Sequence, residues 1–283
     1  MKLLSSATIR RCLIADRGKV ILSADFNQIE LRLAAALAGE TTLIEAAKRG
    51  EHLIKASALK LFGANYNGDQ YRYTKNVTYG WLFGGGAKTL SDQAGIPMRD
   101  ALMMINEYQD AFPALTAYKR REQEAVLRSA LTPMEYKAYK LLRSRMYNFR
   151  DDTREGRAAR AAIKIEIDRL LWRKIGYITT PFGRRLIVDA AKAYTAVNYK
   201  IQSSARDIMA GALLDVMDDP ELEPTVLLPI HDEILGQAYK AEAEYIAERY
   251  GKVMSREFMG VPVSATGKVY GKSWGHGYMT EGT

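Results

Sequence analysis

Two aspartates stand at predicted strand ends, a position from which carboxylates can hold a metal ion. Asp25 follows the apolar run 19–24 (KVILSA), which is typical of a buried strand. Asp232 lies between two short apolar runs, 225–230 and 234–238, that predict a hairpin. Mg²⁺ usually takes one or two carboxylates together with substrate phosphates, and two such ions can activate an attacking oxygen and stabilise a leaving one. The pair predicts metal-assisted phosphoryl chemistry; the alternative is two ordinary solvated turn residues.

A second signal is a row of cations and aromatic rings. Arg72, Lys75, Tyr79 and Phe83 are separated by 3, 4 and 4 positions, which puts them on one side of a helix at about 100° per residue. Two cations followed by two aromatic rings form a surface that can bind phosphates at one end and stack on a base at the other. The alternative is an ordinary amphipathic helix with its aromatic rings in the core and its cations at the rim.

Helices and strands are grouped along the chain. Helical patterns occupy most of residues 28–174, and the run Gly84–Gly86 ends the helix that carries Lys75. The pattern then changes to two strands, GYITT and RRLIV, on either side of the turn PFG. The remaining predicted elements are a long helix (193–217), the hairpin with its acidic tip, a helix (241–258) and a strand (261–269). Segregated helices and antiparallel strands indicate the α+β class.

The composition favours a folded protein with an anionic partner. The chain has 283 residues, 47% of them apolar, and 41 Lys and Arg against 33 Asp and Glu, a formal net charge of +8. Nucleic acid is the first candidate partner; the alternative is a basic protein without a polyanionic target. The excess charge is concentrated in residues 135–174, which carry 12 basic and 6 acidic side chains.

Several classes of protein are excluded. Cys12 is the single cysteine and there are three histidines, which excludes an intrachain disulfide, a cysteine zinc site and a histidine-rich metal site. No apolar run is long enough for a signal peptide or a membrane span. We therefore expect a cytoplasmic protein with no membrane partner.

Three segments resemble the motifs of a known enzyme family. LSADFNQIELR is similar to motif A of the family A (bacterial polymerase I type) DNA polymerases, YRYTKNVTYGWLFGGG to the fingers helix called motif B, and LPIHDEI to motif C. The resemblance covers most of residues 9–279 and fails over about 129–174. It implies an α+β right-hand polymerase fold, with a palm of antiparallel strands backed by helices and helical fingers, and without thumb or exonuclease domain. The implied domains are palm (1–40), fingers (41–128, with the motif B helix at about 70–83), a basic helical insertion (129–174) and palm again (175–283, with the motif C hairpin at about 225–238).

The resemblance also implies site residues. Asp25, Asp232 and the Phe26 carbonyl would bind two Mg²⁺ ions, with Glu233 as a supporting carboxylate and Lys75 as a phosphate contact and candidate general acid. The other implied nucleotide contacts are Gln28, Glu30, His52, Arg72, Tyr79 and Phe83, with Glu30 under the 2′ position of the sugar. The implied DNA contacts are Arg32, Arg184, Arg185, Asn198, Gln202 and His231.

Two positions in the fingers helix depart from the family pattern. Tyr71 stands where the family has an arginine, and Arg72 follows one place later, so the contact with the triphosphate is altered. Phe83 stands where the family often has tyrosine, and without a hydroxyl it cannot hydrogen-bond to Glu30. We therefore expect a less rigid gate against ribonucleotides.

Family members carry a thumb and an exonuclease or exonuclease-like domain before motif A, whereas Met1 lies 24 positions before Asp25. We therefore expect one part of a split polymerase of phage type, acting in the cytoplasm of a bacterial host, with a separate chain that carries the thumb and exonuclease. The basic segment 129–174 would hold duplex DNA in place of the thumb or dock an acidic partner; the alternative is a solvated basic helix.

The predicted function is that of a DNA-directed DNA polymerase that extends a DNA primer–template with dNTPs. One alternative is a non-catalytic nucleic-acid-binding remnant or scaffold subunit, against which Asp25 and Asp232 argue. A second is a single-subunit RNA polymerase, against which the runs QIELR and HDE argue. A third is a metal-dependent hydrolase built on His231 and Asp232, which lacks further histidine ligands at metal-site spacing.

Overall fold

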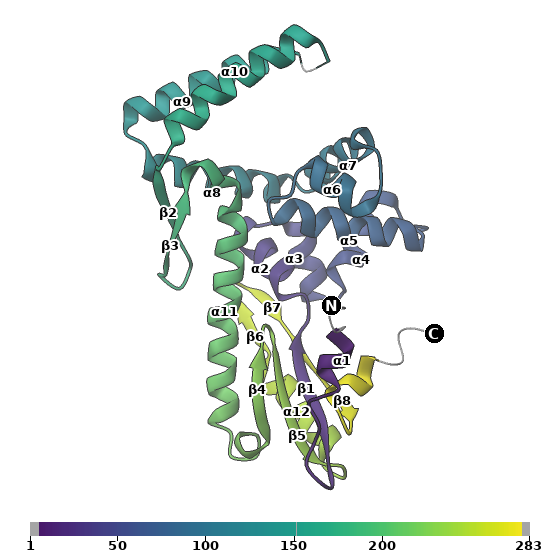
Figure 1. Ribbon diagram of the computed structural model, residues 1–283. Helices are drawn as coiled ribbons and strands as arrows, with labels where there is room; N and C mark the ends of the chain where they lie inside the picture. Colours follow the sequence, from purple (N-terminus) through teal and green to yellow (C-terminus); the bar gives the residue numbers. More distant parts are fainter. Residues whose placement is uncertain (1–5, 151, 279–283) are drawn as a thin grey trace. The chain divides into compact units, whose positions relative to one another are not determined.

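The computed structural model describes residues 6–150 and 152–278, which form two compact units. The first unit comprises residues 1–37, 41–53 and 204–283, and the second comprises residues 38–40 and 54–203. Strands of the first unit form an antiparallel sheet, and the second unit consists of helices and one two-stranded hairpin (Figure 1). The predicted α+β class is confirmed.

The sheet of the first unit has the order β4-β5-β1-β8, with every neighbouring pair antiparallel. Because β1 lies inside the sheet, its side chains Ile21, Leu22 and Ala24 are completely buried. The predicted buried strand is thus confirmed. The strands are β1 (Lys19–Phe26), β4 (Val226–Ile230), β5 (Glu233–Tyr239) and β8 (Ala265–Gly271).

Helix α12 (Ala243–Met254) covers one face of this sheet, in contact with β8, β1 and β5. Its close approach to β8 requires Gly267, because a Cβ at that position would lie 1.8 Å from the Ala247 carbonyl oxygen. The other elements of the unit are α1 (Ser6–Arg10), most of α2 (Ile29–Ala38), α3 (Thr41–Lys48), η2 (Glu223–Thr225), β6 (Arg256–Phe258), β7 (Val261–Val263) and η3 (Trp274–Tyr278).

Two predicted elements near the C-terminus were wrong. The helix predicted over 241–258 ends at Met254, and the strand predicted over 261–269 is two strands. Met259 (φ 50°) and Gly260 (φ 78°) form a left-handed turn that folds β6 back onto β7, whereas β8 leaves this hairpin to pair with β1. Apolar periodicity alone does not reveal such a change of partner.

The second unit contains the helix that carries Lys75. Helix α5 (Gly68–Leu82) starts at a capping box formed by Asn67 and Gln70, which satisfies two backbone amides at its N-terminus. The predicted helix of about 70–83 is confirmed within two residues. The other helices are α4 (Leu53–Phe62), α6 (Ala87–Ala94), α7 (Met98–Ala111), α8 (Pro113–Ala130), α9 (Pro133–Tyr147) and α10 (Arg154–Leu171).

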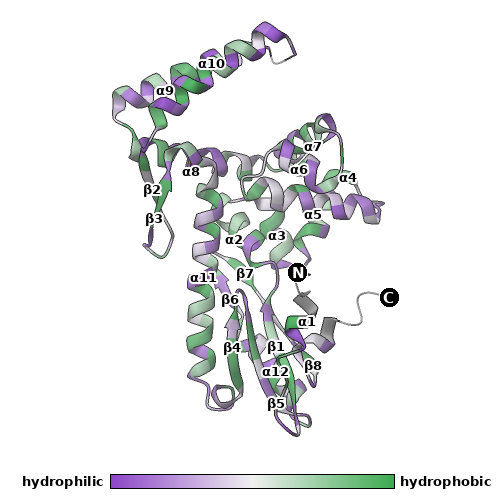
Figure 2. Ribbon diagram, in the orientation of Figure 1, coloured by the Kyte–Doolittle hydropathy of each residue, from purple (hydrophilic) through white to green (hydrophobic). Residues whose placement is uncertain are grey.

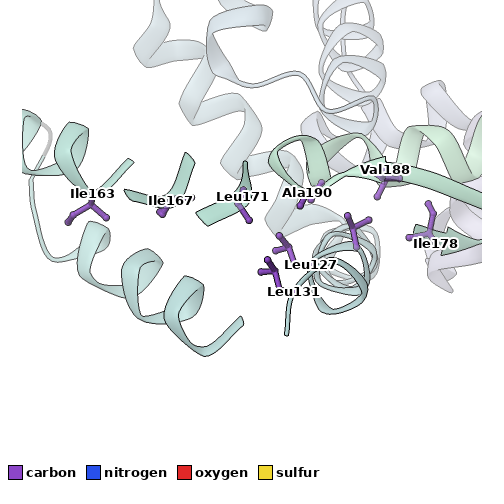
Figure 3. Packing of buried hydrophobic residues seen from close by; sticks show 11 residues of the cluster. Leu127, Leu131, Ile163, Ile167, Leu171, Ile178, Val188 and Ala190 are labelled. Carbon is purple, nitrogen blue, oxygen red and sulfur yellow. The ribbon is translucent and has the colours of Figure 1, made fainter. Parts of the chain in front are cut away.

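Strands β2 (Ile175–Thr179) and β3 (Arg185–Asp189) form the predicted hairpin after the basic segment. They share a hydrophobic core with α8 and α10, whose members are drawn in Figure 3. Of the helix predicted over 193–217, the first three residues belong to the 3₁₀ helix η1 (Ala190–Thr195), which has non-helical backbone at Lys192, and the rest forms α11 (Ala196–Met217). Residues 196–203 of α11 belong to the second unit and 204–217 to the first.

We expect Gly267→Ala to destabilise the first unit by about 1–3 kcal/mol, because the new methyl group overpacks the α12–β8 contact. Urea unfolding followed by circular dichroism measures the change. Gly68→Ala is the matched control, since no atom lies within 4 Å of the position that its Cβ would take, and it should be neutral or slightly stabilising. Equal stability of the two variants would contradict the tight α12–β8 contact.

Candidate functional site

The strand register brings the predicted acidic residues of the first unit to one end of the sheet. β1 pairs with β5 so that Asp25 faces Glu233. His231 and Asp232 form the loop between β4 and β5. The Phe26 amide donates a 3.1 Å hydrogen bond to the Asp232 carbonyl. Motif A and motif C, far apart in the sequence, are therefore held together by backbone pairing.

Partial burial raises the pKa of Asp25 to about 7. The charges of Asp232 and Glu233 act in the same direction, whereas those of Lys268 and His231 oppose them. The Asp25 residue is nonetheless accessible to solvent. An accessible carboxylate that is destabilised by anionic neighbours is a position where a cation would lower the free energy.

The oxygens at this end of the sheet suit a hard cation. Asp25 and Asp232 supply carboxylates and Phe26 a backbone carbonyl, whereas Mg²⁺ completes its coordination with water and substrate phosphates. Within residues 6–150 and 152–278, no group of three or more His, Cys, Asp or Glu side chains is arranged to hold a metal by itself. The chemistry of the donor set therefore fits Mg²⁺ that arrives with a phosphate ligand.

Backbone strain is concentrated around the same carboxylates. Gln28 (φ 54°) lies three residues after Asp25, and His231 (φ 57°) directly precedes Asp232. Left-handed backbone at a residue other than glycine costs about 1–3 kcal/mol and is common at ligand sites. The His231 Nδ1 atom lies 3.2 Å from an Asp232 carboxylate oxygen, so the strained residue also contacts the acidic side chain.

Three residues of the site, Ser23, Tyr270 and Lys268, were not predicted from the sequence. Glu233 is 9% exposed and accepts a 3.2 Å hydrogen bond from the Tyr270 hydroxyl, which itself accepts one of 3.1 Å from Ser23. Lys268 is the third of these residues, and its positive charge lowers the pKa of Asp25. The alternation of Lys268 and Tyr270 along β8 was the available signal, since alternate residues of a strand share one face.

Arg32 lies inside the protein rather than on a DNA-facing surface. It is 3% exposed, and burial lowers the pKa of its guanidinium. The guanidinium donates to the carbonyls of Asn27 (2.7 Å) and Pro262 (2.8 Å). Arg32 therefore ties the segment after β1 to β7, and the predicted contact with DNA has no support in this geometry.

Gln28 and His52, two predicted nucleotide contacts, lie side by side in the first unit. The Gln28 amide nitrogen is 3.0 Å from the His52 ring nitrogens, and its oxygen accepts a 2.8 Å hydrogen bond from the Leu53 amide. Glu30 is half-buried in the first turn of α2. The strained Gln28 thus fixes the orientation of the histidine.

The predicted face of α5 is present in the second unit. Lys75 is exposed, and the Tyr79 and Phe83 rings lie 5.8 Å apart at an interplanar angle of 34°. Arg72 is exposed and forms an ion pair with Asp69. The two cations are exposed and the two rings are half-buried, which favours a binding surface over a helix that keeps its aromatic rings in the core.

Glycines end α5 as predicted. Gly84 (φ 89°) donates to the Trp81 carbonyl and Gly85 to the Gly80 carbonyl, which is the Schellman arrangement. A Cβ at Gly84 would also lie 2.9 Å from the Tyr194 ring. The glycine run therefore positions the end of the helix, just after Phe83.

A buried lysine from another helix also contacts this end of α5. Lys119 of α8 donates to the Trp81 carbonyl, and its ammonium nitrogen lies 4.3 Å from the centroid of the Trp81 ring. Burial lowers the pKa of Lys119 to about 8. A cation at a helix C-terminus interacts favourably with the helix dipole, so Lys119 stabilises the last turn that presents Tyr79.

The predicted DNA contacts fall in three places. Arg184 and Arg185 are exposed at the β2–β3 turn, with Arg185 4.3 Å over the Tyr177 ring. Asn198 and Gln202 lie one turn apart on α11, where Gln202 is exposed. In the part of the chain that the structure describes, the buried Asn198 Oδ1 has no hydrogen-bond partner. His231, 64% exposed at its side chain, belongs to the first unit.

Of the helices in the described ranges, none has the length and apolarity needed to cross a membrane.

A family model described as DNA polymerase family A matches residues 2–168 and 170–276 of the chain. These ranges contain all three motifs. They also include the basic segment 129–174 apart from Arg169, so the match does not stop there as comparison of the motifs alone suggested.

Viral and bacterial DNA polymerases are similar in sequence. The DNA polymerase of Mycobacterium phage D29 is 31% identical over 276 residues, covering 97% of this chain and 38% of the relative. That of Mycobacterium phage L5 is 29% identical, covering 95% of this chain and 36% of the relative. DNA polymerase I of Pseudomonas aeruginosa is 27% identical, covering 87% and 24%. The chain thus spans less than two-fifths of the length of these relatives.

One solved structure has the same fold. It is the POL domain of Pol1 from M. smegmatis in complex with DNA primer-template and dNTP. The TM-score is 0.72 at 22% sequence identity, and the match covers 98% of this chain and 44% of that chain.

We expect Asp25→Asn to stabilise the metal-free protein at pH 8. The folded-state pKa of Asp25 is raised from 3.8 to about 7, so ionisation destabilises the fold above pH 7 and this penalty shrinks as the pH falls toward 4. Urea unfolding in EDTA at pH 8 and pH 5 should show a larger gain at pH 8. Asp92→Asn, at an exposed position on α6, is the control; a gain that is equal at both pH values would contradict the crowding of Asp25.

We expect the stability of the wild type to rise relative to Lys119→Met between pH 7 and pH 9.5. The pKa of Lys119 falls from 10.5 in the unfolded chain to about 8 when folded. The unfolded state therefore binds more protons in this range, and the difference amounts to about 2 kcal/mol. If the free energies of unfolding of the two proteins change equally with pH, the pKa of Lys119 is not lowered in the folded state.

Proposed function

This chain belongs to DNA polymerase family A, and we propose that it catalyses template-directed DNA synthesis. The reaction is nucleotidyl transfer from a dNTP to a primer 3′-OH. The observation that carries the proposal is the pairing of Asp25 with Glu233 beside Asp232, with a raised pKa at Asp25. Residues 1–40 and 175–283 would act as the palm and residues 41–128 as the fingers.

Asp25, Asp232 and the Phe26 carbonyl would hold two Mg²⁺ ions. When bound, these ions supply charge neutralisation at the phosphates and activate the attacking oxygen. Glu233 is held by Tyr270 and adds negative potential from the neighbouring strand. The role of this end of the sheet would therefore be to keep anionic oxygens at fixed positions. Catalysis of phosphoryl transfer depends mainly on such positioning and on charge stabilisation.

Residues on α5 would bind the incoming nucleotide. Lys75 would contact its phosphates and donate a proton to the departing pyrophosphate, with Arg72 beside it. Tyr79 and Phe83, whose rings are already in contact, would pack against the base and sugar. The Schellman turn and Lys119 hold the end of the helix on which these rings sit. Positioning of this kind supplies a large part of the rate enhancement in phosphoryl transfer.

In the first unit, His52 would also contact the triphosphate, with its ring oriented by Gln28. Glu30 would lie under the 2′ position of the sugar and exclude ribonucleotides. Arg184, Arg185, Asn198, Gln202 and His231 would contact the primer–template, and the unpartnered Asn198 Oδ1 is the acceptor best suited to such a ligand. Arg32 would act indirectly, through the backbone that it holds.

The relatives are more than twice as long as this chain. We propose that the thumb and exonuclease functions of a complete enzyme come from polypeptide outside these 283 residues, and the separate chain of a split polymerase is one such source. A non-catalytic remnant that binds nucleic acid remains the second candidate, because its fold would be the same.

Primer extension with the 283-residue chain tests the catalytic proposal. A labelled primer–template, Mg²⁺ and either dNTPs or NTPs are supplied to the wild type, Asp25→Asn, Asp232→Asn and the control Asp92→Asn. We expect the wild type and Asp92→Asn to extend with dNTPs only, and each site variant to lose about 1,000-fold in rate, as loss of several kcal/mol of charge stabilisation implies. DNA binding without extension would point either to an obligate partner chain or to the non-catalytic remnant, and extension with NTPs would favour an RNA polymerase.

A further inference from the structure

We propose that the tip of the α9–α10 arm binds the phosphate backbone of duplex DNA. The arm comprises α9, α10 and the described residues between them, and its arginine tip comprises residues 143–150 and 152–160. The inference rests on the proposed function only in taking the polymerase's own primer–template duplex as the DNA. None of the residues assigned above to catalysis or to primer–template contact lies on the arm.

The charge of the chain is concentrated at the arm. Residues 135–174, which span the arm from Glu135 to the end of α10 together with the three residues that follow α10, carry 12 basic and 6 acidic side chains, a net +6, of a total of +8. The rest of the chain has 29 basic and 27 acidic side chains, a net +2. A strongly basic segment in an otherwise nearly neutral chain is the electrostatic pattern expected for binding a polyanion at that segment.

Some of these cations already have partners. Arg150 pairs with Asp152, Lys164 with Asp168, and Lys174, beyond the end of α10, with Glu135. Arg157 and Arg160 also have partners. Arg143, Arg145 and Arg154 of the tip make no ion pair with a described carboxylate. They remain available for phosphate.

The tip contains only arginine as its basic residue type. Its six basic side chains are Arg143, Arg145, Arg150, Arg154, Arg157 and Arg160. Arginine binds phosphate through two parallel hydrogen bonds and is more weakly hydrated than lysine. On a surface whose charges only increase solubility, lysine and arginine would serve equally well. The use of arginine alone therefore favours phosphate recognition.

Exposed aromatic rings accompany the arginines. Tyr147 is 69% and Phe149 40% exposed. The Arg143 guanidinium lies 5.5 Å from the Tyr147 ring centroid and donates a 3.1 Å hydrogen bond to its hydroxyl. Arginine beside exposed aromatic rings is a common feature of surfaces that bind nucleic acids.

Hydrophobic packing between α9 and α10 holds the two helices of the arm together. Ile163 and Ile167 of α10 are buried against a cluster that includes Tyr139 and Met146 of α9. The base of the arm shares this core with α8 and β2–β3 (Figure 3), and hydrophilic residues lie toward the tip (Figure 2). Since α10 has 18 residues, it is about 27 Å long, and it holds the tip well away from its own base.

Other occupants of the tip are less compatible with these observations. A second copy of the chain would bring its own segment 135–174, of net charge +6, close to the first, and the two like charges would repel each other. An acidic protein would satisfy the charge, but it does not explain the exposed rings of Tyr147 and Phe149 beside Arg143. The phosphate backbone of DNA, with one charge per about 1.7 Å of duplex, satisfies the charge and suits arginine.

The test compares the tip variant Arg143→Gln/Arg145→Gln/Arg154→Gln with a control of equal charge change, Arg17→Gln/Lys240→Gln/Lys272→Gln, at exposed positions of the first unit. The affinity of the 283-residue chain for a fluorescent primer–template is measured from 50 to 200 mM salt. We expect the tip variant to bind at least about tenfold more weakly and to lose about 2.7 from the slope of log K against log salt, as for three phosphate contacts. The control should keep the slope of the wild type.

A second variant separates charge from folding. Arg143→Lys/Arg145→Lys/Arg154→Lys keeps the charge, so it should restore most of the salt slope while binding more weakly than the wild type. Circular dichroism should show the same helix content in all variants. If the tip variant binds DNA like the control, the inference is overturned, and binding of an acidic polypeptide that is lost only in the tip variant would then assign the tip to a protein.

Single-nucleotide incorporation at saturating DNA keeps this inference distinct from the proposed function. We expect the tip variant to retain the wild-type rate per bound complex but to add fewer nucleotides per binding event. Tip-dependent DNA binding in a chain that extends no primer would support the inference while refuting the catalytic proposal. Normal primer extension, with no effect of the tip variant on DNA binding or on the number of nucleotides added, would support the catalytic proposal and refute the inference about the tip.

Discussion

The meeting of Asp25 with Asp232 and Glu233 at one end of the sheet is an electrostatically unfavourable arrangement, and much of the first unit serves to maintain it. The register of β1 and β5 fixes Asp25 opposite Glu233, so the side chains cannot separate without breaking the central strand pairing. The pKa of Asp25 is raised first by its partial burial and then by the charges of Asp232 and Glu233. A fold retains such a cost where a cation will be bound, which ties the stability of the sheet to its proposed chemistry.

Neighbouring groups limit how the carboxylates can relax. Tyr270 holds Glu233 by a hydrogen bond, and Arg32 holds the backbone that follows β1. The left-handed conformations of Gln28 and His231 add strain at the same place. In the second unit, the Schellman turn and Lys119 hold the end of α5 in a comparable way. In each unit, proposed ligand-binding residues such as His231 and Lys75 are exposed, and neighbouring groups hold the backbone that carries them.

Local patterns in the sequence were sufficient for the elements that carry the candidate site. The apolar run before Asp25, the two runs around Asp232 and the 3-4-4 spacing along α5 each predicted the observed element, because strand alternation and helix periodicity are local properties. The refolding of β6 onto β7 was missed, since it depends on left-handed backbone at Met259, a residue type that gives no signal for it. The burial of Arg32 and the contribution of Lys268 were missed because both depend on which strands become neighbours. The sequence motifs also could not indicate that the family match extends through the basic segment.

The ionisation of Asp25 is the most direct measure of the central claim, that carboxylates are crowded here to receive a divalent cation. Carbon-13 NMR of labelled aspartate carboxyl groups would follow the titration without metal and with Mg²⁺ and a dNTP. We expect one carboxyl that titrates near pH 7 without metal, that is missing from Asp25→Asn, and that shifts to lower pH when Mg²⁺ and dNTP are added. A pKa for Asp25 near 3.8, unchanged by the metal and nucleotide, would contradict the claim.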